Sequence, residues 1–294
     1  MNPWASGRLP VFAAAFLFST GGAAIKYCQL GSWQVAGFRS GIAALTLLLL
    51  VPQARRGWSR ATWAVGAAYA ATVILFVAAN KLTTSASAIF LQSTAPVYIL
   101  LLGPWLLKER LRGLDLATTA ILAAGAVLML QGADPAGATA PDPRRGNLLA
   151  ILSGFFYACT VVGIRWRSKS GASSGGSSIS GVAAGNLLAF LVCLPGALPV
   201  EEWRLGDGLS LAFLGVFQMA LAYVCLTKGL GKVPALEASL LLLVEPVFNP
   251  LWAWLVHGER PGTWTLAGGA VILAGTILQS LVTPKRGSPA SEPT

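Results

Sequence analysis

The sequence predicts an all-α integral membrane protein with ten transmembrane helices, arranged as two inverted five-helix repeats. Three observations predict it. Of the 294 residues, 55% are hydrophobic and only 11% are charged, whereas ordinary soluble domains carry about 25% charged residues. Continuous apolar runs such as Ile42–Val51 and Ala120–Leu130 favour helices over the alternating pattern of a membrane β-barrel. The second half of the chain also repeats motifs of the first.

Ten apolar segments fill most of the chain, and about 20 apolar residues are enough for one helix to cross the bilayer. The predicted spans are Pro10–Ile25, Gln34–Val51, Thr62–Ala79, Thr84–Leu107, Leu114–Leu130, Asn147–Ile164, Ile179–Leu198, Leu209–Thr227, Leu236–Val256 and Thr263–Val282. Only short loops remain between them. The function must therefore lie within the helix bundle, because no room is left for a folded soluble domain.

Composition divides the chain into two repeats, a connecting loop and a tail. Residues 1–131 form the first five-helix repeat, and residues 146–282 form the second. The connecting loop 132–145 is rich in Ala, Pro, Gly and Asp, and Ser168–Ser178 is almost wholly Ser and Gly, which predicts a flexible tether. The polar tail 283–294 is expected to be disordered.

The basic residues predict the orientation of the spans. Most of the 21 Lys and Arg residues fall near the N-terminus, in alternate loops and in the C-terminal tail. Basic residues concentrate in cytoplasmic loops, so both termini are expected in the cytoplasm and the span count is expected to be even. The net charge of +10 is then a topology signal and does not indicate nucleic-acid binding, since the charges are spread over short segments.

The repeat becomes visible at a single offset of 150 residues. Without a gap, this offset aligns Ala95-Pro96-Val97-Tyr98 with Glu245-Pro246-Val247-Phe248, Glu109-Arg110 with Glu259-Arg260, and Ile121–Gly125 with Val271–Gly275. Each half has five spans, so the second half enters the membrane from the opposite side. Such inverted repeats, related by a two-fold axis in the membrane plane, are common in secondary transporters.

These markers resemble two EamA domains of the drug/metabolite transporter superfamily. Arg39, in Val35-Ala36-Gly37-Phe38-Arg39, matches an arginine common in the second span of that family. Within the family, the chain is most similar to the YddG-type exporters of aromatic and other amino acids. The resemblance implies a ten-helix carrier of the bacterial inner membrane with a central substrate cavity. Relatives carry amino acids, nucleosides, sugars or drugs, so the substrate does not follow from the family.

Two prolines are the candidate gating residues. A proline inside a helix removes one backbone hydrogen bond and clashes with the preceding turn. Pro96 and Pro246 lie at matched positions near the centres of their spans, where each is expected to kink the helix and free a carbonyl. An ordinary packing kink is the alternative. Gly37-x-x-x-Gly41 and Gly181-x-x-x-Gly185 are expected to be packing seams, either within one chain or between two chains.

Polar and aromatic side chains within spans are the candidate substrate-binding residues, because polar groups at membrane depth are costly and tend to face the bundle interior. The predicted set is Phe76, Asn80, Gln92, Tyr98, Tyr157, Gln218 and Glu245. Glu245 stands out because a carboxylate at this depth can exchange protons or pair with a substrate amine, and its counterpart is Ala95. Arg39 is expected to be structural or to reach towards the interface.

The predicted function is export of small amphipathic metabolites, most of all amino acids including aromatic ones, by alternating access. Partners would be the amino acid, the bilayer and, for coupled transport, protons, with a monomer or a homodimer as the assembly. No catalytic constellation, metal-ligand cluster or phosphate-binding loop is readable, so no enzyme activity, metal or cofactor is expected. One alternative is another substrate class: nucleosides, sugars or drugs. The other is a channel-like facilitator, which is disfavoured because the sequence has no repeated charged or carbonyl-rich segment of the kind that forms a selectivity filter.

Overall fold

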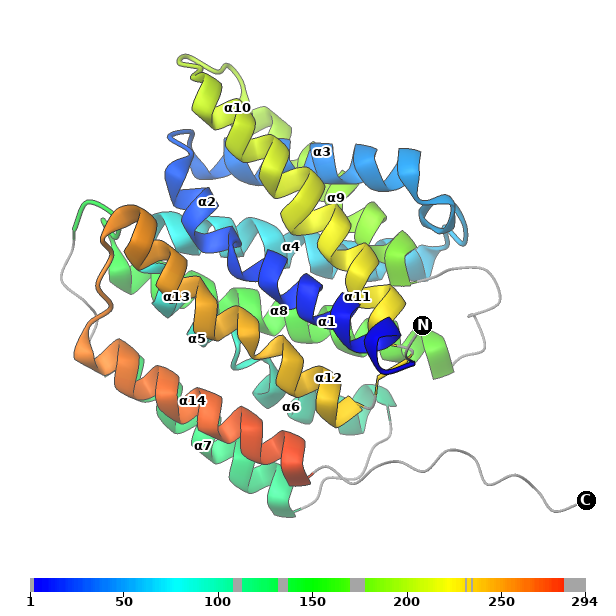
Figure 1. The fold of residues 1–294 in the computed structure, drawn as a ribbon, viewed down its shortest axis with the longest axis vertical. Coiled ribbons are helices and arrows are strands. Elements are labelled where there is room, and N and C mark those ends of the chain that lie inside the picture. The colour runs from blue at the N-terminus through cyan, green and yellow to red at the C-terminus, as the bar shows by residue number, and fades with distance from the viewer. Residues whose placement is uncertain are drawn as a thin grey trace, which may run out of the picture.

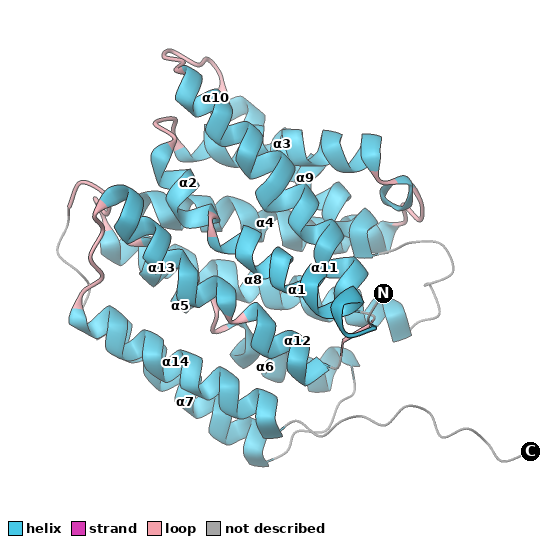
Figure 2. Cartoon of the chain, in the orientation of Figure 1, coloured by secondary structure: helices cyan, strands magenta, loops and turns pink. Residues whose placement is uncertain are grey.

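The structure is a computed structural model that describes residues 3–107, 113–131, 137–169, 178–230, 232–233 and 235–282. Within these ranges the chain is helical apart from short loops, turns and one isolated β-bridge between Gly137 and Ala140 (Figure 2). The predicted all-α class is confirmed. Glu109-Arg110, most of Ser168–Ser178 and the tail 283–294 lie outside the described residues.

The helices follow the predicted spans closely, and several spans consist of two consecutive helices (Figure 1). The helices are α1 (Pro3–Ser19), α2 (Gly21–Tyr27), α3 (Ser32–Leu50), the short 3₁₀ helix η1 (Pro52–Arg55), α4 (Arg60–Leu82), α5 (Ser85–Gln92), α6 (Ala95–Leu107), α7 (Gly113–Gln131), α8 (Pro143–Lys169), α9 (Ser178–Ala197), α10 (Leu205–Ala212), the π-helical segment η3 (Phe213–Leu221), α11 (Ala222–Leu230), α12 (Ala235–Leu242), α13 (Val244–His257) and α14 (Thr263–Val282).

Eight helical stretches among the described residues are long and apolar enough to cross a membrane. Two shorter apolar helices, Leu116–Gln131 and Thr263–Leu278, occupy the fifth and tenth predicted spans. This arrangement is consistent with ten spans. It also supports a membrane as the solvent, since large apolar side chains such as Leu50 and Trp105 point outward and are 74% and 87% exposed.

The helix contacts follow the pattern of an inverted repeat. Equivalent helices of the two halves pack against each other, α7 against α14 and α3 against α9. The second and third spans also pack across the two halves. The third span of the first half (α4) contacts the second span of the other half (α9), and the second span of the first half (α3) contacts the third span of the other half (η3). In Figure 1, α7 and α14 lie side by side along one edge of the molecule. A two-fold relation between the halves produces this exchange.

Glycines on α7 and α14 show the same relation at the level of single contacts. A Cβ atom added at Gly125 would lie 2.8 Å from the Ile272 side chain, and one added at Gly275 would lie 3.2 Å from the Leu122 side chain. Gly125 and Gly275 are counterparts at the 150-residue offset, as are Leu122 and Ile272. One glycine–aliphatic contact is therefore made twice with the partners exchanged, and small residues let the two helices approach closely.

The fourth and ninth spans are broken at matched positions. Ser93 separates α5 from α6 with φ −67° and ψ −2°, and Leu243 separates α12 from α13 with φ −64° and ψ −14°. The two residues are 150 positions apart, and in each repeat a proline, Pro96 or Pro246, follows three residues later. Each proline lies in the first turn of the helix that follows the break, since α6 begins at Ala95 and α13 at Val244; proline is tolerated there because its missing N–H would have no partner within the helix.

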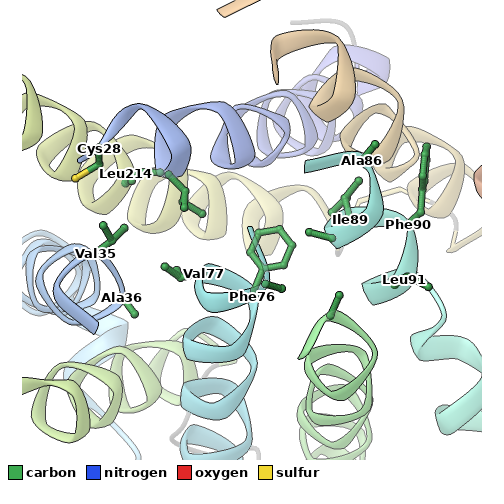
Figure 3. Packing of buried hydrophobic residues seen from close by; sticks show 14 of the residues in the cluster. Cys28, Val35, Ala36, Phe76, Val77, Ala86, Ile89, Phe90, Leu91 and Leu214 are labelled. Carbon is green, nitrogen blue, oxygen red and sulfur yellow. The ribbon is translucent and has the colours of Figure 1, made fainter. Parts of the chain in front are cut away.

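The largest apolar core lies where α2, α3, α4, α5 and η3 meet. In Figure 3, Val77 and Phe76 of α4 lie between Val35 of α3 on one side and Ile89 and Leu91 of α5 on the other. Small residues such as Ala36 alternate with these larger ones. In lipid such cores are held together by close packing more than by exclusion of water.

The two GxxxG motifs are packing seams within the chain. A Cβ atom at Gly37 would lie 2.9 Å from the Cys193 side chain of α9, and one at Gly41 would lie 2.8 Å from Phe190 of the same helix. At Gly185 the added atom would lie 2.5 Å from the ring of Tyr69. These glycines therefore allow α3 and α4 to pack closely against α9 within one chain.

Candidate functional site

The carboxylate of Glu245 lies at the break in the ninth span. It belongs to the first turn of α13, directly after the break at Leu243. The side chain is half-buried and makes no hydrogen bond or ion pair within the described part of the chain. A carboxylate without a partner at membrane depth is costly, so Glu245 is a group that a cationic ligand would stabilise.

Three tyrosines from different helices, called here the tyrosine cluster, interact with one another, and two of them lie near Glu245: the cluster is Tyr69 of α4, Tyr157 of α8 and Tyr223 of α11. Tyr157 and Tyr223 are both close enough to Glu245 for electrostatic interaction. The rings of Tyr69 and Tyr223 meet edge to face with centroids 5.5 Å apart. Tyr157, in the middle of α8, is 39% exposed.

Arg39 of α3 is buried on the other side of the tyrosine cluster. The residue is only 2% exposed, which agrees with the first of its two expected roles, a structural one, and not with a side chain that reaches towards the interface. The guanidinium donates from Nη2 to the Val73 carbonyl at 3.3 Å, and its Nε has no hydrogen-bond partner among the described residues. Arg39 stays buried because α3 is enclosed here by α4, α9 and η3, which leaves its long side chain no route to the membrane surface.

Gln92 and Tyr98 join the broken fourth span to α8. The Gln92 amide donates to Ser153 Oγ at 2.8 Å, and Ser153 Oγ in turn donates to the Thr72 carbonyl of α4 at 3.0 Å. Tyr98 meets Phe155 edge to face with centroids 5.6 Å apart. Both predicted site residues, Gln92 and Tyr98, thus make contacts within the protein. Through them, the helices on the two sides of the break, α5 and α6, are held against α8.

Gln218 and Asn249 are buried polar side chains that face α2. Gln218, within the π-helical segment, packs against Gly21, where a Cβ atom would lie 2.8 Å from its Nε2. Asn249 packs against Gly22 in the same way at 2.6 Å. Gln218 Oε1 and both polar atoms of the Asn249 amide have no partner within the described ranges. Buried amides normally have partners, so these two side chains are candidates for contacts made in another state or with a ligand.

Phe76 and Asn80 lie on α4 inside the apolar core. Phe76 is 8% exposed and packs in the largest core cluster. Asn80 is fully buried and donates from Nδ2 to the Phe76 carbonyl at 3.0 Å, within its own helix. In this structure both residues serve packing, and the structure does not bring them together with Glu245.

A buried ion pair closes one end of the bundle. Lys26 Nζ at the end of α2 lies 3.1 Å from Glu259 Oε2, and the two side chains are 4% and 2% exposed. The other carboxylate oxygen accepts the Ser85 N–H at the start of α5 at 2.6 Å, and Lys26 also donates to the Thr83 and Thr139 carbonyls. This Glu259 cluster joins α2, α5, the α13–α14 loop and the connecting segment.

Sequence reasoning missed the Glu259 cluster and Tyr69. Lys26 and Glu259 are 233 residues apart, and each stands at a span end, where a charge usually reports topology. Tyr69 lies in a run of small residues, Val65–Ala71, and nothing in the local pattern indicates its partner. Among the described residues, no group of three or more His, Cys, Asp or Glu side chains could hold a metal ion.

The chain matches a protein family over nearly its whole length. The family described as the EamA-like transporter family matches residues 5–131 and 144–281, which are the two halves. A solved crystal structure with 20% sequence identity superposes with a TM-score of 0.61, covering 94% of this chain and 97% of the other. At that identity the superposition shows the shared fold.

Relatives of the chain are named as transporters. It is 27% identical to the pseudopaline exporter CntI of Pseudomonas aeruginosa over 291 residues, covering 94% of this chain and 96% of the relative. A probable terminal-alkyne amino-acid exporter of Streptantibioticus cattleyicolor is 33% identical over 134 residues, 43% of this chain and 45% of that one. An uncharacterized transporter of Archaeoglobus fulgidus is 28% identical, covering 70% of this chain and 71% of the relative.

Proposed function

The chain belongs to the EamA-like transporter family, and we propose that it exports small amphipathic metabolites, most of all amino acids including aromatic ones, across the bacterial inner membrane. The observation that carries this proposal is the unpaired carboxylate of Glu245 beside the tyrosine cluster, at the break of the ninth span. The carboxylate would bind the substrate ammonium, and the rings would stack against an apolar or aromatic side chain.

Alternating access follows from the inverted repeat together with the closed Glu259 end. At that end α5 packs against α13. The two-fold relation between the halves exchanges α5 with α12 and α13 with α6. A second state would therefore close the opposite end by packing α12 against α6, with the breaks at Ser93 and Leu243 as the hinges. If both termini lie in the cytoplasm, as the basic residues predict, the Glu259 end would face outward, and this structure would correspond to a state closed to the outside.

Counterflow in proteoliposomes tests the proposal. Proteoliposomes that contain the purified protein are loaded with one unlabelled compound, and uptake of the same compound in labelled form is measured. The assay is repeated for a panel of amino acids, nucleosides and sugars. We expect saturable counterflow for amino acids and a strong reduction of its rate in Glu245→Gln. Glu202→Gln is the matched control, because Glu202 is an exposed loop residue with an 83% exposed side chain. Counterflow of nucleosides or sugars alone would reject amino acids as the substrates, and non-saturable flux would indicate a channel-like facilitator.

Pseudopaline is the second substrate candidate. The exporter named for it aligns with nearly the whole of this chain, so the compound belongs in the same panel. Repeating the assay with and without a pH gradient tests protons as a coupling partner. Accumulation driven by the gradient in the wild type, and its loss in Glu245→Gln, is the outcome expected for coupling through this carboxylate.

A further inference from the structure

Arg39 and Glu245 are two charged residues of opposite sign that lie within spans and lack a charged partner. In the described ranges Arg39 has no ion pair, and its only hydrogen bond joins Nη2 to the Val73 carbonyl. Glu245 has neither. A charge in this position is costly unless it is paired. Two such charges on different helices therefore require an explanation.

The fold does not require either charge. Glu245 has Ala95 as its counterpart at the 150-residue offset. If the two GxxxG motifs are aligned, Arg39 has Ala183 as its counterpart, and both alanines are buried. Each repeat thus builds the same helix with a small apolar residue at the position where the other repeat has a charge. This asymmetry points to the ligand as the reason for the charges.

The tyrosine cluster connects the two charges. Val73, which accepts the Arg39 hydrogen bond, follows Tyr69 by one turn of α4, so the guanidinium lies along the face of α4 that carries Tyr69. Asn186 donates to the Tyr69 hydroxyl at 3.4 Å, and the Tyr69 ring meets Tyr223. Tyr223 is close enough to both Arg39 and Glu245 for electrostatic interaction.

Of the two tyrosines close to Arg39, Tyr223 is more accessible to a ligand than Tyr69. Tyr69 is only 2% exposed, whereas Tyr223 is half-buried and packs its ring on Phe18 with centroids 5.0 Å apart. The Tyr223 hydroxyl also interacts with the Tyr69 hydroxyl. A phenol donates only one hydrogen bond, and the positive charge of Arg39 nearby makes a substrate anion a stronger acceptor for it than the neutral Tyr69 hydroxyl.

Building on the proposed function, we infer that the site selects zwitterions: Glu245 binds the substrate ammonium, and the Tyr223 hydroxyl, backed by Arg39, binds the substrate carboxylate. Arg39 is then a positioning residue that acts through its electrostatic field. An amine without a carboxylate would lose the Tyr223 end of the site. An acid without an amine would lose the Glu245 end and be repelled by its charge.

Competition against counterflow of one transported amino acid separates the two ends. The competitors are the unlabelled amino acid, its decarboxylated amine and its deaminated acid. In the wild type we expect the zwitterion to compete about 10- to 100-fold better than either analogue, because each lacks one charge-assisted hydrogen bond. Tyr223→Phe keeps the ring and removes only the hydroxyl. It should lower the zwitterion-to-amine preference about tenfold and leave the zwitterion-to-acid preference unchanged.

Three further variants complete the test. Glu245→Gln should show the opposite pattern in its reduced counterflow: a lower zwitterion-to-acid preference and an unchanged zwitterion-to-amine preference. Arg39→Gln should follow Tyr223→Phe in preference, provided that it elutes as a folded protein. Tyr27→Phe, at a 54% exposed position, is the matched control and should change neither ratio.

The outcomes separate this inference from the proposed function. If no amino acid gives counterflow, the proposed function fails and the zwitterion site fails with it. If amino acids are transported but the wild type accepts the amine equally well, the inference alone is overturned. It is also overturned if Tyr223→Phe changes both ratios to the same extent or changes neither.

Discussion

Breaking the Lys26–Glu259 ion pair should open the end of the bundle that this pair closes. The perturbation is Glu259→Gln, which keeps the shape of the side chain and an oxygen for the Ser85 N–H but removes the charge that Lys26 faces at 3.1 Å. Removing one partner of a buried ion pair costs about 3–5 kcal/mol. We take the lower end of this range, because Lys26 keeps the Thr83 and Thr139 carbonyls. At about 1.4 kcal/mol per tenfold, the population open at this end should rise on the order of 100-fold.

Cys28 is the natural reporter of this opening. It follows Lys26 by two residues and is fully buried, and burial raises the pKa of its thiol to about 11. At pH 7.5 the closed state therefore offers almost no thiolate, whereas a free cysteine, with a pKa of about 8.5, would be about 10% thiolate. Opening thus increases both access and reactivity. Labelling by a membrane-impermeant maleimide, with Cys159, Cys193 and Cys225 replaced by Ala, should speed up in Glu259→Gln.

A double variant guards against general unfolding. Lys26→Met combined with Glu259→Gln removes both charges and leaves no unpaired ammonium, so labelling of Cys28 should return towards the wild-type rate. The reasoning is refuted if the single variant labels within twofold of the wild type while denatured protein labels fully. It is equally refuted if the double variant labels as fast as the single variant.

Four further substitutions test the packing and the helix breaks. Gly268→Ala places a Cβ atom 2.5 Å from the Gly125 carbonyl oxygen and should destabilise the protein by about 1–3 kcal/mol in thermal unfolding, whereas Gly113→Ala, with nothing within 4 Å, should not; equal melting temperatures would contradict the glycine seam. Pro96→Ala and Pro246→Ala should each lower counterflow more than expression, and full activity in both would reject a hinge role. Gln92→Ala removes one side-chain hydrogen bond between α5 and α8 and should cost about 1 kcal/mol, which unchanged melting would disprove.

The sequence was sufficient for the spans and the repeat because both depend on local patterns. Apolar runs locate the helices, and the matched prolines locate the breaks at Ser93 and Leu243, because proline affects its own turn whatever surrounds it. Glu245 could be proposed for a similar reason, since a carboxylate in an apolar run stands out. For Arg39 the sequence left two alternatives open, a structural residue or one that reaches towards the interface, because whether a long side chain can reach the interface depends on which helices enclose it.

The contacts between distant parts of the chain could not be predicted in this way. The Glu259 cluster joins residues from both repeats, and Tyr69 meets Tyr223 across 154 positions. Each of these residues has an ordinary local explanation, as a topology charge or as one aromatic residue among many. Only the packing of α2 and α5 against the α13–α14 loop turns two isolated charges into an ion pair.

The α7–α14 seam also provides a fixed frame for spectroscopy. At Gly125 and Gly268 the backbone carbonyl of each residue lies against the Cα of the other, so neither helix can slide or rotate without a collision. Spin labels on the outer faces of these two helices should therefore keep a constant separation in every state of the cycle. Labels on α6 and α12 can be triangulated against that pair, which makes absolute displacements of the moving helices measurable in a single membrane preparation.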